Sequence, residues 1–191
     1  MNTNTELKRH TAEQDNTSFL KIISKSASAA LGMALLTVGL LVPRANAETT
    51  VSMADTNFIL AAAQGGMTEV KLGELAATNG MRDDVKAFGQ RMVKDHTAIN
   101  DDLKALAAQK GVSLPDGLDT KHQAKVDKLT ALTGPEFDDA YIAGMIKAHK
   151  KDAKAFKAEA AATQDADIKS FLDKSIPVVE DHLKCITAMN K

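Results

Sequence analysis

Four polar side chains stand where a helix would be expected to bury apolar ones. Glu69, His96, His149 and His182 each interrupt a series of apolar residues that recurs at steps of three and four, the spacing of an inward-facing helix surface. Neutral imidazoles and a carboxylate are ligands that Fe, Zn, Mn and Cu accept. Metal sites in helix bundles are built from side chains on facing helices that meet in the core. These four residues are therefore candidate ligands of one transition-metal ion.

Aspartates accompany these candidates. Asp152 lies three positions after His149, so the two share a helix face and Asp152 is a further candidate ligand. Asp95 and Asp181 each directly precede a candidate histidine, and neighbouring residues of a helix point about 100° apart. We therefore expect these two carboxylates to orient a histidine of an adjacent helix, not to share a metal with their neighbour.

Three interpretations of the candidate residues stay open at this point. Four protein ligands would close the coordination shell, which favours storage or structure over catalysis and suits metal handling or protection against oxidative stress. A metal-free hydrogen-bonded layer that only fixes the register of the helices is the alternative. A redox or peroxide-active enzyme with an open coordination position is the third. The sequence has no Gly-rich phosphate loop, nucleophile elbow or Cys-pair metal motif, so it does not support hydrolase or nucleotide-binding functions.

The elements that would position the candidates are helices. The chain is rich in Ala, Lys and Leu, and its Gly and Pro residues cluster at a few places that divide it into segments. We expect four long helices over residues 55–79, 82–110, 135–162 and 165–189, with a short helix over 119–132. The long link between the second and third long helices predicts an all-α, ferritin-like four-helix bundle with one long crossover. Each candidate lies about fifteen residues or slightly more into its helix, so all four should fall in one layer near mid-length.

The N-terminal segment has the features of a secretory signal peptide. Lys21 and Lys25 precede the uncharged, apolar run 27–42, and Ala45-Asn46-Ala47 follows as a small-x-small cleavage site. The run is shorter than the roughly 20 apolar residues that a membrane-spanning helix needs. We expect residues 1–47 to be removed and residues 48–191 to form one exported, periplasmic domain.

Charge and composition exclude some partners. The leader holds five of the 24 basic and three of the 25 acidic residues, which leaves 19 and 22 and a net charge of −3. A nucleic-acid-binding domain is normally basic, and with one Tyr and no Trp there is little on which bases could stack. No segment of the predicted mature domain is expected to span a membrane, and its protein partners stay open. Cys185 is the single cysteine and cannot form an internal disulfide, so we expect an inert thiol.

Several short motifs resemble those of the ferritin-like DUF 4142 family, often labelled "predicted outer membrane protein". The resemblance covers nearly all of residues 55–189. Two of its motifs lie in the first half of this range, namely Phe58 through Glu69 to Leu75 and Met92-Val93-Lys94-Asp95-His96. The other two are Leu132-Thr133-Gly134-Pro135-Glu136-Phe137-Asp138 with Tyr141 and His149, and Ile176-Pro177 with His182-Leu183. It implies an exported helical bundle and supports Glu69, His96, His149 and His182 as the functional layer. An association with the outer membrane rests on this label alone.

The sequence departs from the pattern of di-iron ferritin-like proteins. Those proteins carry Glu-x-x-His on two helices and a Glu on each of the others. The residues three positions before the candidate histidines are instead Val93, Ile146 and Val179. With one clear carboxylate, the sequence favours a histidine-rich site for a single metal over a di-iron centre.

Overall fold

The computed structural model describes residues 51–190, so the predicted signal peptide of residues 1–47 lies outside the described part of the chain. Within that part the chain forms helices and no strand. The helices are α1 (Met53–Asn79), α2 (Asp83–Gln109), α3 (Thr120–Thr130), α4 (Gly134–Ala162) and α5 (Ala166–Met189). Their ends lie within two residues of the expected ones.

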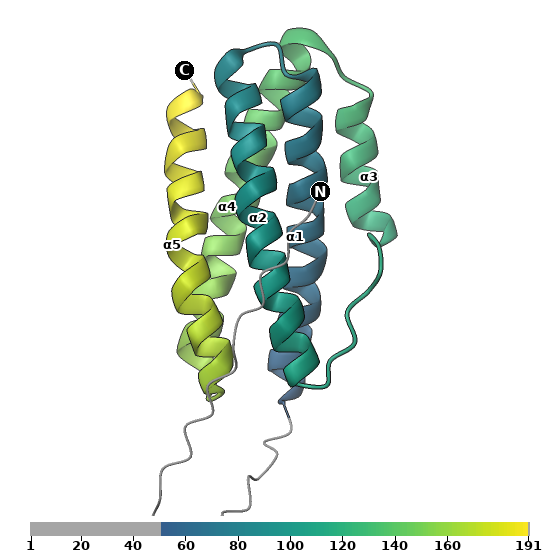
Figure 1. Ribbon diagram of the computed structural model, residues 1–191. Coiled ribbons are helices and arrows are strands. Elements are labelled where there is room, and N and C mark those ends of the chain that lie inside the picture. Colours follow the sequence, from purple (N-terminus) through teal and green to yellow (C-terminus); the bar gives the residue numbers. More distant parts are fainter. Residues whose placement is uncertain (1–50, 191) are drawn as a thin grey trace, which may run out of the picture. The chain divides into compact units, whose positions relative to one another are not determined.

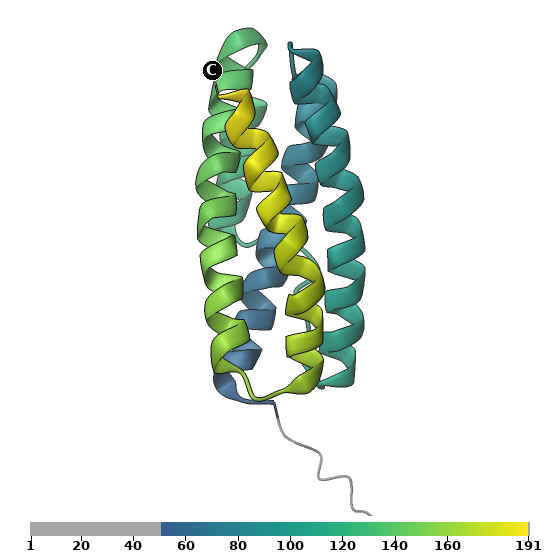
Figure 2. The same ribbon diagram turned by 90° about the vertical axis from the view of Figure 1, so that its left-hand side faces the viewer.

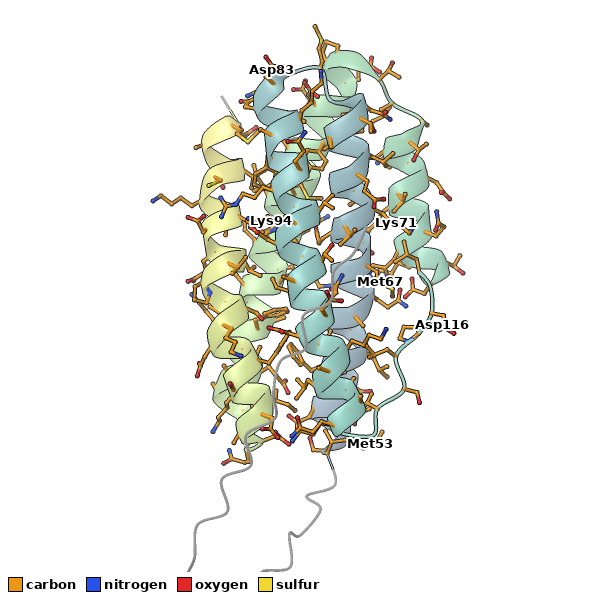
Figure 3. The ribbon with its side chains drawn as sticks, in the orientation of Figure 1. Met53, Met67, Lys71, Asp83, Lys94 and Asp116 are labelled. Carbon is orange, nitrogen blue, oxygen red and sulfur yellow. The ribbon has the colours of Figure 1, made fainter. Side chains whose placement is uncertain are left out.

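The four long helices form one bundle, and α3 lies outside it against α1 (Figure 1). α1 packs mainly on α2 and α4 on α5, while contacts of α2 with α5 and of α1 with α4 close the ring. Met53 at the start of α1 and Asp83 at the start of α2 lie at opposite ends of the bundle, as expected of an antiparallel pair (Figure 3). The crossover returns the chain along the bundle, so that α2 and α4 run parallel, and Figure 2 shows the same bundle from the side.

The predicted fold class, an all-α four-helix bundle with a short helix in one long crossover, is therefore confirmed. Among the helices that the structure describes, none combines the length and apolar character needed to cross a bilayer.

Side-chain caps mark where three of the helices begin. The hydroxyl of Ser52 accepts a hydrogen bond from the backbone N–H of Asp55 at the start of α1. Asp119 accepts one from the N–H of His122 in α3, and Asp165 accepts two in the first turn of α5. Each cap satisfies a donor that the first helical turn leaves free, and losing one typically costs about 1 kcal/mol.

The start of α2 is capped from a distant part of the chain. Asp138 on α4 is 1% exposed, and its carboxylate accepts hydrogen bonds from the backbone N–H groups of Met81 and Arg82, at 2.9 and 2.8 Å. This carboxylate therefore fastens the α1–α2 turn to α4. The aspartate of the Gly-Pro-Glu-Phe-Asp motif thus has a structural role that its sequence context did not indicate.

Two glycines allow α1 and α2 to pack closely. A Cβ added at Gly89 would lie 2.7 Å from the carbonyl oxygen of Gly73, and one at Gly73 would lie 2.9 Å from that of Gly89. These distances are too short for a side chain, so a larger residue at either position would push the helices apart. The tight α1–α2 pair holds one wall of the bundle in place.

A polar layer divides the interior of the bundle into two apolar clusters. One cluster includes Leu72, Met92 and Met145, and the other includes Leu103 and Phe156. Between these clusters, each of the four long helices contributes one of the predicted ligands to the polar layer. These are Glu69, His96, His149 and His182, and all four are buried.

Candidate metal centre

Three histidines from three helices meet at the centre of this layer. His96 on α2, His149 on α4 and His182 on α5 have pairwise ring-centroid distances of 5.7, 5.3 and 5.5 Å. One ring nitrogen of each lies within 4.8 Å of the corresponding nitrogens of the other two. The rings are 6%, 1% and 0% exposed, so the cluster is shielded from solvent.

Hydrogen bonds on the outer side of two rings fix their tautomers. Nδ1 of His149 lies 3.0 Å from the carbonyl oxygen of Met145, and Nε2 of His182 lies 2.9 Å from Oδ2 of Asp95. Because each partner can only accept, these nitrogens carry the protons of the neutral rings. Nε2 of His149 and Nδ1 of His182 therefore present bare lone pairs.

These lone pairs, together with Nε2 of His96, are buried and have no hydrogen-bond partner among the residues that the structure describes. A buried polar atom without a partner costs about 1–3 kcal/mol. Three such nitrogens in one cluster are the feature that a metal ion would satisfy.

The electrostatic surroundings keep all three rings neutral. Burial lowers the pKa of His96 to about 3, with a further contribution from His149 and His182. Burial also lowers the pKa of His149 to about 4, against the hydrogen bond to the Met145 carbonyl. For His182, burial lowers the pKa although Asp95 favours the charged form. At neutral pH a metal ion would not have to displace protons from these rings.

The spacing of the nitrogens is close to that of a coordination sphere. In a triangle with edges of 4.8 Å each corner is about 2.8 Å from the centre, whereas histidine nitrogens bind zinc at about 2.0–2.1 Å. Shifts below about 1 Å, within reach of small changes in side-chain torsions, would bring all three nitrogens to bonding distance.

The two carboxylates proposed as ligands do not join this group. Neither Glu69 nor Asp152 belongs to the set of mutually close ligand atoms in the described chain. The nearby charges that act on Glu69 are those of Asp152 on α4 and Lys125 on α3. The structure thus brings together three of the four expected ligands.

Glu69 is nevertheless an unusual residue. It is 4% exposed, and its Oε2 atom is buried with no hydrogen-bond partner in the described residues. Burial and the nearby Asp152 raise the pKa of Glu69 to about 8, although Lys125 opposes the shift. Burial also raises the pKa of Asp152, against the charge of Lys151. Glu69 is therefore protonated at neutral pH and can donate a hydrogen bond.

A cavity of about 190 Å³ adjoins the histidines. Its polar lining residues are Glu69, Asp152, His96, His149 and Lys151, and the remainder is apolar, namely Phe58, Ala61, Ala62, Gly65, Gly66, Ile99, Leu103, Ala155, Phe156, Phe171 and Val179. His182 does not line the cavity. This space was not predicted from the sequence, and its signal would have been the small residues 61, 62, 65 and 66 of α1, which line it.

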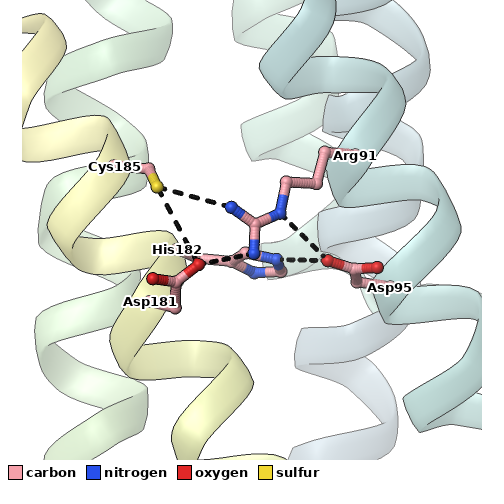
Figure 4. A network of polar contacts seen from close by, with 5 residues as sticks. All are labelled: Arg91, Asp95, Asp181, His182 and Cys185. Atoms are coloured by element: carbon pink, nitrogen blue, oxygen red, sulfur yellow. Dashed lines mark hydrogen bonds and ion pairs between the residues drawn. The ribbon is translucent and has the colours of Figure 1, made fainter.

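The opposite side of the cluster is held by a network of charged side chains, shown in Figure 4. Asp95 accepts hydrogen bonds from His182 and from Nε of Arg91, at 2.9 and 3.2 Å. The Arg91 guanidinium also donates to Oδ2 of Asp181 at 2.6 Å and to Sγ of Cys185 at 3.4 Å. Burial opposes the charged form of Asp95, but the bonds from His182 and Arg91 outweigh it and lower the pKa of Asp95.

Asp95 thus orients a histidine of an adjacent helix, as expected. For Asp181 that expectation was wrong, because its carboxylate accepts hydrogen bonds from Arg91 and Cys185 and, among the described residues, from no histidine. Arg91 was missed in the sequence, where it is one of many surface cations, and only its contacts reveal that it supports Asp95. Cys185 is half-buried at the edge of this network.

The comparisons with known proteins agree with this fold. The family model described as "Domain of unknown function (DUF4142)" matches residues 40–189. Among solved structures, a DUF305 fragment from Deinococcus radiodurans is similar, with a TM-score of 0.64 and 10% sequence identity over 73% of this chain and 96% of that one. That likeness concerns the fold alone. Among curated proteins, none matches the sequence. The chain belongs to the DUF4142 family.

Proposed function

We propose that this protein binds one transition-metal ion at the centre of its bundle through His96, His149 and His182, and that it serves in metal handling outside the cytoplasm. The observation that carries the proposal is the convergence of three buried histidines, each of which holds a ring nitrogen without a hydrogen-bond partner among the described residues. A cation that accepts their lone pairs would offset the cost of burying them.

The alternative interpretation, a metal-free polar layer that fixes helix register, is less well supported. Such a layer is favourable when its members satisfy one another through hydrogen bonds. The rings of His149 and His182 bond outward, to the Met145 carbonyl and to Asp95, and no hydrogen bond joins one of the three rings to another in the described chain. Nε2 of His149 and Nδ1 of His182 therefore have lone pairs that accept no hydrogen bond from any described residue.

The donor set narrows the choice of metal. Imidazole nitrogens suit Zn, Cu and Fe, whereas Mn and other hard ions favour carboxylate and water oxygens. Because both carboxylates lie outside the histidine group, Cu and Zn fit these ligands better than Mn. The bonds from His149 to a backbone carbonyl and from His182 to a carboxylate are the kind that usually orient metal-binding histidines.

Three ligands instead of four also change the expected coordination. Four ligands would close a tetrahedral shell, whereas three leave a position for another molecule. We therefore replace the closed storage site expected from the sequence with an open site.

The export that this role requires is supported by the signal-peptide features of residues 1–47.

Elemental analysis of the purified, untagged protein tests the proposal. Protein dialysed against Cu(II) or Zn(II) and then freed of loose metal should retain one equivalent, and the His96→Ala, His149→Ala double variant should retain less than one tenth of that amount. His122→Ala is the matched control, because His122 lies on α3 outside the cluster and binds Asp119. It should retain a full equivalent.

Retention of metal by the double variant, or its absence from the folded parent protein, would contradict the proposal. Circular dichroism of each protein establishes that the bundle is folded. A folded parent protein without metal would leave the metal-free layer as the better explanation.

A further inference from the structure

We propose that the cavity beside the histidines is the ligand pocket of the metal centre, and that it takes a small monoanion with an apolar body about the size of a benzene ring. This inference rests on the proposed metal site and adds the class of molecule that would bind there.

The position of the cavity supports this role. His96 and His149 line it, while His182 lies behind them and is fully buried. A metal held by the three rings would therefore have protein on the His182 side and free space on the side of α1 and α4. The position that three ligands leave open would face that space.

Charge explains the preference for an anion. Three neutral imidazoles leave the charge of a divalent cation uncompensated in a buried site, where charges interact strongly. Asp95 is hydrogen-bonded to His182 and shares its charge with Arg91, and neither Glu69 nor Asp152 belongs to the histidine group. An anionic ligand atom would reduce the remaining charge, and Lys151 on the cavity wall would favour its entry.

The polar and apolar parts of the lining define the rest of the ligand. Oε2 of Glu69 is a buried polar atom without a partner, and it can form a hydrogen bond with the anionic end of the ligand. Most of the remaining wall is apolar, with Phe58, Leu103 and Phe156 among its larger side chains. A cavity of about 150 Å³ accommodates benzene, so about 190 Å³ fits a body of that size.

Benzoate is a suitable probe, with acetate and 1-naphthoate as smaller and larger carboxylates. Each is titrated into the Cu(II)-loaded protein, and changes in the electron paramagnetic resonance and visible absorption of copper report binding. We expect saturable binding of benzoate, at least tenfold tighter than that of acetate or 1-naphthoate. Equal affinities for all three, or no spectral change, would overturn the proposal.

A pair of glycine variants locates the binding. A Cβ at Gly65, on the cavity wall, or at Gly144, on α4 away from the cavity, would meet no atom within 4 Å. Gly65→Phe should therefore place a ring in the cavity and weaken benzoate binding at least tenfold, whereas Gly144→Phe should leave it unchanged. Unchanged binding by a folded Gly65→Phe protein would contradict the assignment of this cavity.

Copper content, measured on the same samples, separates the two proposals. If a folded protein retains one copper ion and the copper spectrum does not respond to benzoate, the pocket fails and the metal site stands. If no copper is retained, both fail.

Discussion

The two sides of the histidine layer are built differently. Toward the surface of α2 and α5, His182 donates to Asp95, Asp95 accepts from Arg91, and Arg91 donates to Asp181, so that every charge has a partner (Figure 4). Toward α1 and α4, Glu69, His96 and His149 border a cavity, and Oε2 of Glu69 and Nε2 of each histidine have no partner among the described residues.

This contrast separates the part of the site that holds its shape from the part that remains free to bind. Paired groups on the α2–α5 side fix the tautomer and orientation of His182, as ligands of metal sites require. The unpartnered atoms on the α1–α4 side reduce the stability of the metal-free protein, since buried polar groups are normally hydrogen-bonded. The polar layer should therefore destabilise the empty protein and favour the loaded one.

The largest expected effect is on the stability of the protein in acid, and it comes from the α1–α4 side, where the buried polar atoms have no partner among the described residues. The pKa of His96 is lowered from 6.5 to about 3, so the unfolded state gains a proton below pH 6.5 that the folded state does not. Stability is therefore lost as pH falls, by about 3 kcal/mol between pH 6.5 and 4 from His96 alone. In metal-free urea unfolding, His96→Leu should remove that part of the loss and His122→Leu should not. Identical pH slopes in the parent protein and His96→Leu would contradict the neutral layer.

The second-largest effect comes from Glu69, and its dependence on pH is opposite to that of His96. Burial and Asp152 raise the pKa of Glu69 from 4.5 to about 8, so its contribution is fully present below pH 4.5 and is lost as pH rises toward 8. Between pH 6.5 and 8 the metal-free protein should lose about 2 kcal/mol through this group. Glu69→Gln should abolish the loss, whereas Glu74→Gln, at an exposed position of the same helix, should retain it. A parent protein as stable at pH 8 as at pH 6.5 would argue against a protonated Glu69.

On the paired side, Asp95→Ala leaves the Nε2–H of buried His182 without its acceptor. We expect a loss of about 1–3 kcal/mol in the free energy of unfolding and a 10- to 100-fold weaker affinity for the metal. Asp102→Ala, on the exposed face of the same helix, should change neither quantity. Chemical denaturation and competition with a chelator measure the two effects. An unaltered metal affinity would show that Asp95 does not position His182.

The smallest effect is expected at the outer edge of the paired side. Cys185→Ser removes a weak contact with Arg91 at 3.4 Å and should change the free energy of unfolding by less than about 0.5 kcal/mol. Metal content should stay at one equivalent, because the thiol belongs to the charged network and not to the histidine cluster. Loss of metal in this variant would add a thiolate to the ligands.

The fold was predictable because its determinants are local. The helices are defined by the apolar spacing, by the Gly and Pro residues between segments, and by the caps at Ser52, Asp119 and Asp165. Because the helices are nearly equal in length, the histidines lie in one layer. The convergence of His96, His149 and His182 follows from that register.

The rest of the site depends on how the helices turn and how closely they approach. Glu69 lines the cavity with His96, His149 and Asp152 but does not join the histidine group. The rotation of α1 decides where its carboxylate lies, and a periodic pattern does not fix that rotation to within one residue. The cavity depends on the separation of α1 from α4 around Gly65, and the cap of Asp138 joins residues more than fifty positions apart. These are properties of tertiary packing that no local pattern encodes.

X-ray absorption spectroscopy of the protein loaded with one equivalent of Cu(II) or Zn(II) tests the central claim most directly. We expect three imidazole nitrogens at about 2.0 Å, together with one light ligand that is not histidine. Addition of benzoate should leave the imidazole count unchanged. A sulfur neighbour near 2.3 Å, or fewer than two imidazoles, would contradict a metal centre on His96, His149 and His182.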